Sequence, residues 1–140
     1  METLSGVQAI RVLLVDDNSN FLAITRLVLL TSEDIEVVGD ADDGERSLEQ
    51  VERLRPDVVV MDCRMPRMDG PEATRRILLS HPGTRVVALS IGDDRELLRG
   101  MRRAGAHGVV LKGAGPEELG RAIRSAFDQT PPGSTTGGTG

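Results

Sequence analysis

Short runs of apolar residues alternate along the chain with longer segments in which apolar residues recur every three or four positions. The runs are rich in Val, Ile and Leu and no longer than six residues, which favours strands over buried helices. The segments between them have the spacing of amphipathic helices, each with one apolar stripe. The pattern therefore predicts five strand–helix units, with strands at residues 10–15, 35–38, 58–61, 86–89 and 109–111.

This alternation predicts an α/β fold in which parallel strands are joined by right-handed crossover helices on both faces of one sheet. Runs 10–15, 58–61 and 86–89 are uninterrupted, as expected of strands that are covered on both faces. The run at 35–38 is broken by Glu36 and the run at 109–111 is short, which suits the two edges. The predicted fold class is thus a doubly wound five-stranded parallel sheet of order 2-1-3-4-5, whose switch point lies between strands one and three.

The length of 140 residues fits one globular domain, and we assign it to residues 9–128. Residues 1–8 are interpreted as a flexible leader. Residues 129–140 read QTPPGSTTGGTG and contain no large apolar side chain, so we expect a disordered tail or linker. The sequence leaves open whether this segment is a natural tail, a linker to an output domain or a remnant of cloning.

Composition narrows the function classes. The formal net charge of −5 argues against a domain that grips nucleic acid or an anionic membrane by charge alone. The one cysteine, Cys63, excludes an intrachain disulfide, and no apolar run approaches the roughly 20 residues of a membrane span. The N-terminus also lacks the pattern of a signal peptide. We therefore expect a cytoplasmic domain with no membrane contact.

Polar residues follow four of the five predicted strands. Asp16 and Asp17 follow the first strand, Asp62 the third, Ser90 the fourth, and Lys112 the fifth. Lys112 is the single lysine among 17 basic residues. Because the carboxyl ends of parallel strands meet at one edge, and ligands bind there at the switch point, these side chains are expected to converge.

The chemistry of this group points to phosphoryl transfer. Carboxylates held close together repel one another and either share protons or recruit a cation, and an all-oxygen ligand set favours Mg²⁺. An amine and a hydroxyl suit a phosphoryl group, and a carboxylate can itself be the nucleophile that forms an aspartyl-phosphate. Taken singly, each residue has a simpler explanation as a helix cap, a turn residue or a solvated charge. Their joint occurrence at strand ends favours a site.

The segments VLLVDDNSNF, DVVVMDCRMPRMDG, VVALS and AGAHGVVLK, in this order and spacing, resemble the receiver domains of two-component response regulators. Receivers have a flavodoxin-like fold, and the likeness runs from about residue 10 to residue 127. The stretch AGAHGVVLKGAGPEELGRAI is similar to receivers of NarL/LuxR-type transcription factors.

The resemblance implies a role for each residue. Asp62 matches the phosphoacceptor, which takes its phosphoryl group from a phosphohistidine on a sensor histidine kinase. Ser90 and Lys112 match the groups that contact the phosphoryl oxygens. The implied Mg²⁺ site comprises the carboxylates of Asp17 and Asp62, the backbone carbonyl of Arg64, and Asp16 through water.

The function implied by the resemblance is a phosphorylation-controlled switch that is not an enzyme beyond assisting its own phosphorylation and dephosphorylation. Its output would be transcription, through an output domain or DNA contacted outside these residues, with no direct nucleic-acid contact by this domain. A phosphorylation-linked homodimer is a further expectation. The chain departs from the family at Val109, where receivers usually carry Tyr or Phe, so the coupling from Ser90 to the outer surface is expected to differ.

Two alternatives remain open at this point. A phosphatase of the haloacid-dehalogenase type uses similar groups but places its nucleophile after the first strand as D-x-D, whereas this chain has Asp16-Asp17-Asn18 there. A receiver-like interaction module that accepts no phosphate is the other alternative, although such a module has no evident need for the acids.

Overall fold

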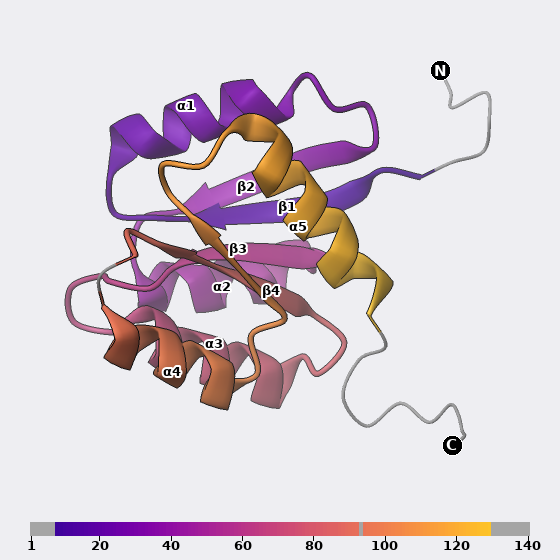
Figure 1. Ribbon diagram of the computed structural model, residues 1–140. Helices are drawn as coiled ribbons and strands as arrows, with labels where there is room; N and C mark the ends of the chain where they lie inside the picture. Colours follow the sequence, from indigo (N-terminus) through magenta and orange to yellow (C-terminus); the bar gives the residue numbers. More distant parts are fainter. Residues whose placement is uncertain (1–7, 93, 130–140) are drawn as a thin grey trace.

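The computed structural model describes residues 8–92 and 94–129, which form five strands and five helices in strict alternation (Figure 1). Residues 1–7 of the predicted leader and residues 130–140 of the predicted tail lie outside the described residues. The elements are β1 (Ile10–Val15), α1 (Ser19–Leu29), β2 (Ile35–Ala41), α2 (Gly44–Leu54), β3 (Val58–Asp62), α3 (Gly70–Ser80), β4 (Arg85–Ser90), α4 (Arg95–Ala104), β5 (Gly108–Leu111) and α5 (Pro116–Asp128).

All strand pairs are parallel and the sheet order is β2-β1-β3-β4-β5, which confirms the predicted fold class and both predicted edges. β2 is longer than predicted, because it continues through Gly39 and Asp40 to Ala41. An edge strand is covered less completely than an inner one, so its apolar run underestimates its length. The register between β1 and β2 shifts between Val12 and Leu13, which pair with Val37 and Gly39.

The helices form two layers around the sheet. In Figure 1, α1 and α5 cover one face of the sheet while α2, α3 and α4 cover the other. Side chains alternate between these faces: Leu13 and Met61 pack towards α2–α4, and Leu14 and Val60 pack towards α1 and α5. Both cores are built almost wholly from aliphatic and methionine side chains, in a chain with no Trp or Tyr and two Phe. Burial of one such side chain contributes about 1.5–3 kcal/mol, so the inner strands are firmly anchored.

Four of the helices begin at a polar cap residue. Asn18, Asp43, Asp69 and Asp94 each accept a hydrogen bond from the backbone N–H three residues later. This arrangement satisfies N–H groups that have no partner within the helix. Asn18 is the residue that caps α1, so the two aspartates before it are available for other contacts.

Gly70, the first residue of α3, lies directly against the backbone that follows Asp62. Its N–H donates to the carbonyl of Cys63 at 2.9 Å. A Cβ atom at Gly70 would lie 2.8 Å from the Cα of Cys63 and also against the carbonyl of Asp62. The close approach closes the β3–α3 loop and fixes the chain immediately after Asp62.

We predict that Gly70→Ala lowers the free energy of unfolding by about 1–3 kcal/mol, because backbone on both sides must move to accept the methyl group. Urea unfolding followed by circular dichroism measures the change. Gly83→Ala is the matched control, since no atom lies within 4 Å of a Cβ at that position. Equal midpoints for the two variants would contradict the close packing described.

Candidate functional site

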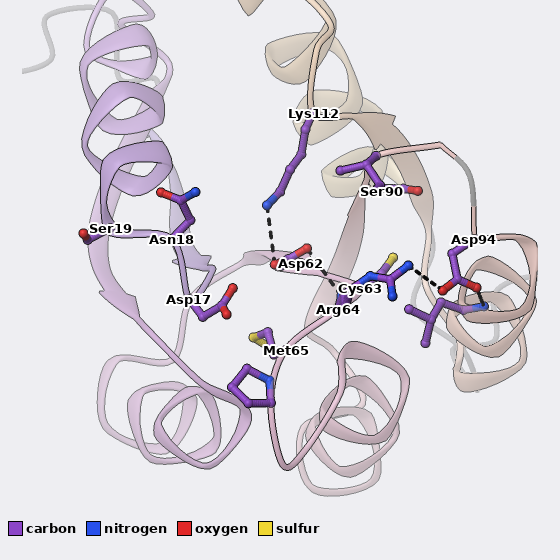
Figure 2. Close-up of a pocket in the computed structure, with 13 residues that line it drawn as sticks. Asp17, Asn18, Ser19, Asp62, Cys63, Arg64, Met65, Ser90, Asp94 and Lys112 are labelled. Carbon is purple, nitrogen blue, oxygen red and sulfur yellow. Dashed lines mark hydrogen bonds and ion pairs between the residues drawn. The ribbon is translucent and has the colours of Figure 1, made fainter.

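A pocket of about 820 Å³ opens at the carboxyl edge of the sheet, over the predicted switch point (Figure 2). Its walls come from the ends of β1, β3, β4 and β5, with the first turns of α1 and α4 beside them. Five predicted site residues line it, namely Asp17, Asp62, Arg64, Ser90 and Lys112. The sixth, Asp16, lies beneath the wall with only 1% of its surface exposed.

The three aspartates form one cluster. Asp16, Asp17 and Asp62 each offer a carboxylate oxygen, and these atoms all lie within 4.8 Å of one another. Asp16 and Asp62 are buried, whereas Asp17 is exposed at the rim. The predicted convergence of the strand ends is therefore found in the structure.

Lys112 opposes this negative charge. Its Nζ lies 2.8 Å from Oδ2 of Asp16 and 3.5 Å from Oδ2 of Asp62. Burial favours the neutral amine, but the hydrogen bond to Asp16 and the charges of both aspartates outweigh it and raise the pKa of Lys112. The ammonium also lies 4.7 Å from the ring centroid of Phe21, within the range of a cation–π contact.

The carboxyl group of Asp62 has a raised pKa. Burial, followed by the charge of Asp16, raises its pKa to about 6, although Lys112 and the backbone N–H of Arg64 act in the opposite direction. That N–H lies 3.4 Å from Oδ1 of Asp62. The cluster thus carries more negative charge than Lys112 alone balances.

The donor set fits a hard divalent cation such as Mg²⁺. Asp17 and Asp62 present carboxylates to the pocket, while Asp16 is engaged by Lys112 through Oδ2 and by the N–H of Asn18 through Oδ1 at 2.9 Å. Cys63 offers no thiolate, because burial raises its pKa to about 12. Oxygen ligands without an available soft ligand favour magnesium over zinc or copper.

Two residues at the far side of the pocket are engaged with the β4–α4 segment. The hydroxyl of Ser90 accepts a hydrogen bond from the N–H of Gly92 at 2.9 Å, and Figure 2 shows it directed away from Asp62. Arg64 Nη2 lies 2.7 Å from Oδ2 of Asp94, which also caps α4. Neither group is therefore oriented towards the Asp62 carboxylate by its own hydrogen bonds.

Sequence reasoning missed two contributors to the site. No sequence motif marks Phe21, which lies in α1, yet its ring contacts the ammonium of Lys112. No sequence motif marks Asp94 either, yet it holds the side chain of Arg64. Val109, the position that departs from the family pattern, is half-buried and packs into the core on the α2–α4 side of the sheet.

Comparison with known proteins decides the family. The family described as response regulator receiver domain matches residues 12–124. The chain is a response regulator receiver domain. As such it is a signalling domain of two-component systems. No helix among its described residues is long and apolar enough to cross a membrane.

Curated relatives of this receiver domain are regulators of the NarL/LuxR type. Response regulator GacA from Pseudomonas viridiflava is 45% identical over 84% of this chain and 55% of its own length. Response regulator UvrY from Escherichia coli is 39% identical over 84% of this chain and 54% of its own length. The chain thus spans about half the length of the curated relatives that it matches.

Solved structures of response regulators show the same likeness. The signal receiver domain of a response regulator named NarL from Mycobacterium tuberculosis superposes with a TM-score of 0.82 at 31% identity, covering 88% of this chain and 99% of that one. A LuxR-family response regulator from Aurantimonas gives a TM-score of 0.80 at 29% identity, covering 86% of each chain. The predicted likeness to NarL/LuxR-type receivers is therefore confirmed.

The raised pKa of Asp62 has a consequence for stability. A carboxyl whose pKa is higher in the folded than in the unfolded protein binds more protons when folded, so stability falls as pH rises from about 4 to about 6. We predict that Asp62→Asn raises the free energy of unfolding at pH 7, without divalent cations, by about 1–2 kcal/mol. The gain should vanish near pH 4.

Urea unfolding in the presence of a chelator measures this difference at the two pH values. Asp42→Asn, which removes an exposed acid, is the control and should leave the midpoint unchanged. A midpoint for Asp62→Asn at pH 7 that is equal to or below that of the wild type would refute the excess of negative charge in the cluster.

Proposed function

We propose that this receiver domain is a phosphorylation-controlled switch whose phosphoacceptor is Asp62. The observation that carries the proposal is the position of this carboxylate, which lines an open pocket. Its Oδ2 lies 3.5 Å from Nζ of Lys112, and two further acids lie beside it. A pKa of about 6 leaves the carboxylate ionised at neutral pH, so it can act as a nucleophile.

In the proposed reaction an oxygen of Asp62 attacks the phosphorus of a phosphohistidine on a sensor histidine kinase. The new bond is the acyl phosphate O–P bond, the bond that breaks is N–P, and the imidazole that leaves takes up a proton. Lys112 stands where it can pair with a phosphoryl oxygen. Ser90 would exchange its hydrogen bond from Gly92 for one to the phosphoryl group.

Mg²⁺ is the proposed cofactor, and when bound it neutralises charge on the phosphoryl oxygens. Asp17 and Asp62 are the proposed side-chain ligands, and the backbone carbonyl of Arg64 is the proposed third protein ligand. Asp16 is buried and paired with Lys112, which suits a residue that would hold the metal through water.

The output proposed for the whole protein is control of transcription. The relatives carry such names, among them the transcriptional regulatory protein DegU from Brevibacillus brevis, which is 36% identical over 82% of this chain. The proposed partners are a sensor histidine kinase, an output domain that contacts DNA, and a second copy of the chain after phosphorylation. The receiver domain itself would contact no nucleic acid and would catalyse nothing beyond its own phosphorylation and dephosphorylation.

The phosphatase alternative is less well supported. Its D-x-D motif would stand at the end of β1, but there Asp16 is tied to Lys112 and buried, and the acid that lines the pocket from β3 is Asp62. The interaction-module alternative does not explain why three acids cluster in and beneath the pocket.

We predict that the protein gains the mass of one phosphoryl group when it is incubated with Mg²⁺ and a small phosphodonor such as phosphoramidate. Asp62→Asn should abolish the gain and Asp42→Asn should retain it, as measured by intact mass spectrometry. Persistence of the gain in Asp62→Asn would rule out the assignment. Release of many phosphates per chain from a phosphomonoester would favour the phosphatase, and no gain in the wild type would favour the interaction module.

We further predict that millimolar Mg²⁺ raises the midpoint of thermal unfolding, because a ligand that binds only the folded state stabilises it. Asp17→Asn should remove most of this shift. Asp17 is exposed, so its substitution leaves the fold intact. Ser19→Ala, at the same rim of the pocket, should keep the shift. An unchanged shift in Asp17→Asn would exclude that carboxylate as a ligand.

A further inference from the structure

Two arginines of the β3–α3 loop each form an ion pair with the cap residue of a neighbouring helix. Arg67 Nη2 lies 3.0 Å from Oδ2 of Asp43, which caps α2. Arg64 Nη2 lies 2.7 Å from Oδ2 of Asp94, which caps α4. The two pairs are alike in chemistry and exposure, but only Arg64 lines the pocket that contains Asp62. The loop that follows Asp62 is therefore tied to α4 from within the site.

The pair bears directly on the first turn of α4. While Oδ2 of Asp94 holds Arg64, its Oδ1 accepts a hydrogen bond from the N–H of Leu97 at 3.1 Å (Figure 2). Met101 is the one residue of α4 that is fully buried. Leu97 and Leu98 also pack against the core but are only partly buried. A helix with one fully buried side chain opens or shifts at lower cost than the inner strands, so a contact at its cap matters.

Arg64 is also well placed to respond to charge on Asp62. It stands two residues after Asp62, its backbone N–H lies 3.4 Å from Oδ1 of that residue, and 61% of its side chain is exposed. An exposed ion pair contributes at most about 1 kcal/mol. A phosphoryl group carries a charge of about −1.5 to −2 and offers oxygens that a guanidinium can bind in a bidentate manner. The phosphoryl group is thus the stronger partner.

We propose that Arg64 is a switch residue whose guanidinium leaves Asp94 for the phosphoryl group on Asp62, which frees the first turn of α4 to move. The inference rests on the proposed phosphorylation of Asp62 and adds a route by which that event reaches the surface. The route needs no aromatic ring at position 109. It therefore links Asp62 to α4 in a chain that has Val109 where receivers usually carry Tyr or Phe. It is electrostatic and local, and it uses groups already in contact.

The test is the backbone amide resonance of Leu97 in ¹H–¹⁵N spectra, recorded before and after treatment with Mg²⁺ and phosphoramidate. In the wild type this resonance should move on phosphorylation. In Arg64→Gln and in Asp94→Asn the untreated protein should already show it displaced towards the phosphorylated wild-type position, since the ion pair is absent. Asparagine remains a good cap, so Asp94→Asn removes the charge without removing the start of the helix.

Arg67→Gln is the matched control, because it breaks the equivalent ion pair to α2 and should leave Leu97 and its response unchanged. The lifetime of the phosphorylated state gives a second readout: Arg64→Gln should shorten it by about two- to fivefold, the effect of losing one exposed ionic contact. A full wild-type response of Leu97 in Arg64→Gln, with phosphate uptake intact, would overturn the switch alone. Absence of uptake in the wild type would overturn the proposed function and this inference together.

Discussion

The crowding of negative charge at one edge of the sheet is the constraint on which the rest of the molecule depends. Parallel strands end at the same edge, so carboxylate oxygens of the acids at the ends of β1 and β3 come within 4.8 Å of one another, and one ammonium opposes them. The imbalance is visible in Asp62, whose pKa is raised to about 6 by burial and by Asp16. A cluster that is unfavourable by itself gains most from a cation and from an ammonium placed beside it. In the proposed function, stability given up by the folded protein would be converted into affinity for the cation and the phosphoryl group.

Much of this could be predicted from the sequence because parallel α/β topology leaves few choices. Apolar runs indicated the strands, their continuity separated inner from edge strands, and the residue after four of the five runs belongs to the acid, hydroxyl or amine group at the sheet edge. The prediction was weakest for the edge strand, which does not require an uninterrupted apolar run. β2 extends three residues beyond its apolar run, through Gly39 and Asp40 to Ala41. The helix caps were only partly resolved, since the acids after the first strand could also be explained as caps and the structure assigns the cap of α1 to Asn18.

What the sequence could not supply were contacts between elements that are distant along the chain. Phe21 reaches Lys112 because α1 lies beside the end of β5, and Arg64 reaches Asp94 because the β3–α3 loop lies beside α4. Neither contact follows from spacing or periodicity, since each depends on how long side chains cross a gap between loops. The preference of Lys112 for Asp16 over Asp62, 2.8 Å against 3.5 Å, is of the same kind. Fold and site membership are thus set by topology, while partners within the site are set by packing.

The contacts that restrain the β4–α4 segment share one property, which bears on how the domain could signal. Ser90 is held by the N–H of Gly92 on one side of the segment, and Asp94 is held by Arg64 on the other. Each contact is a single hydrogen bond or an exposed ion pair, of about 1 kcal/mol or less. A phosphoryl group on Asp62 would compete for the hydroxyl and for the guanidinium at once, so the two restraints would be lost together. Two weak contacts of this size, released by one charge, shift a population by at most roughly 30-fold, which is enough for a reversible signal and small enough to reset. On the proposed route, a chain with valine at position 109 would report phosphorylation through polar contacts, without an aromatic ring that turns inward.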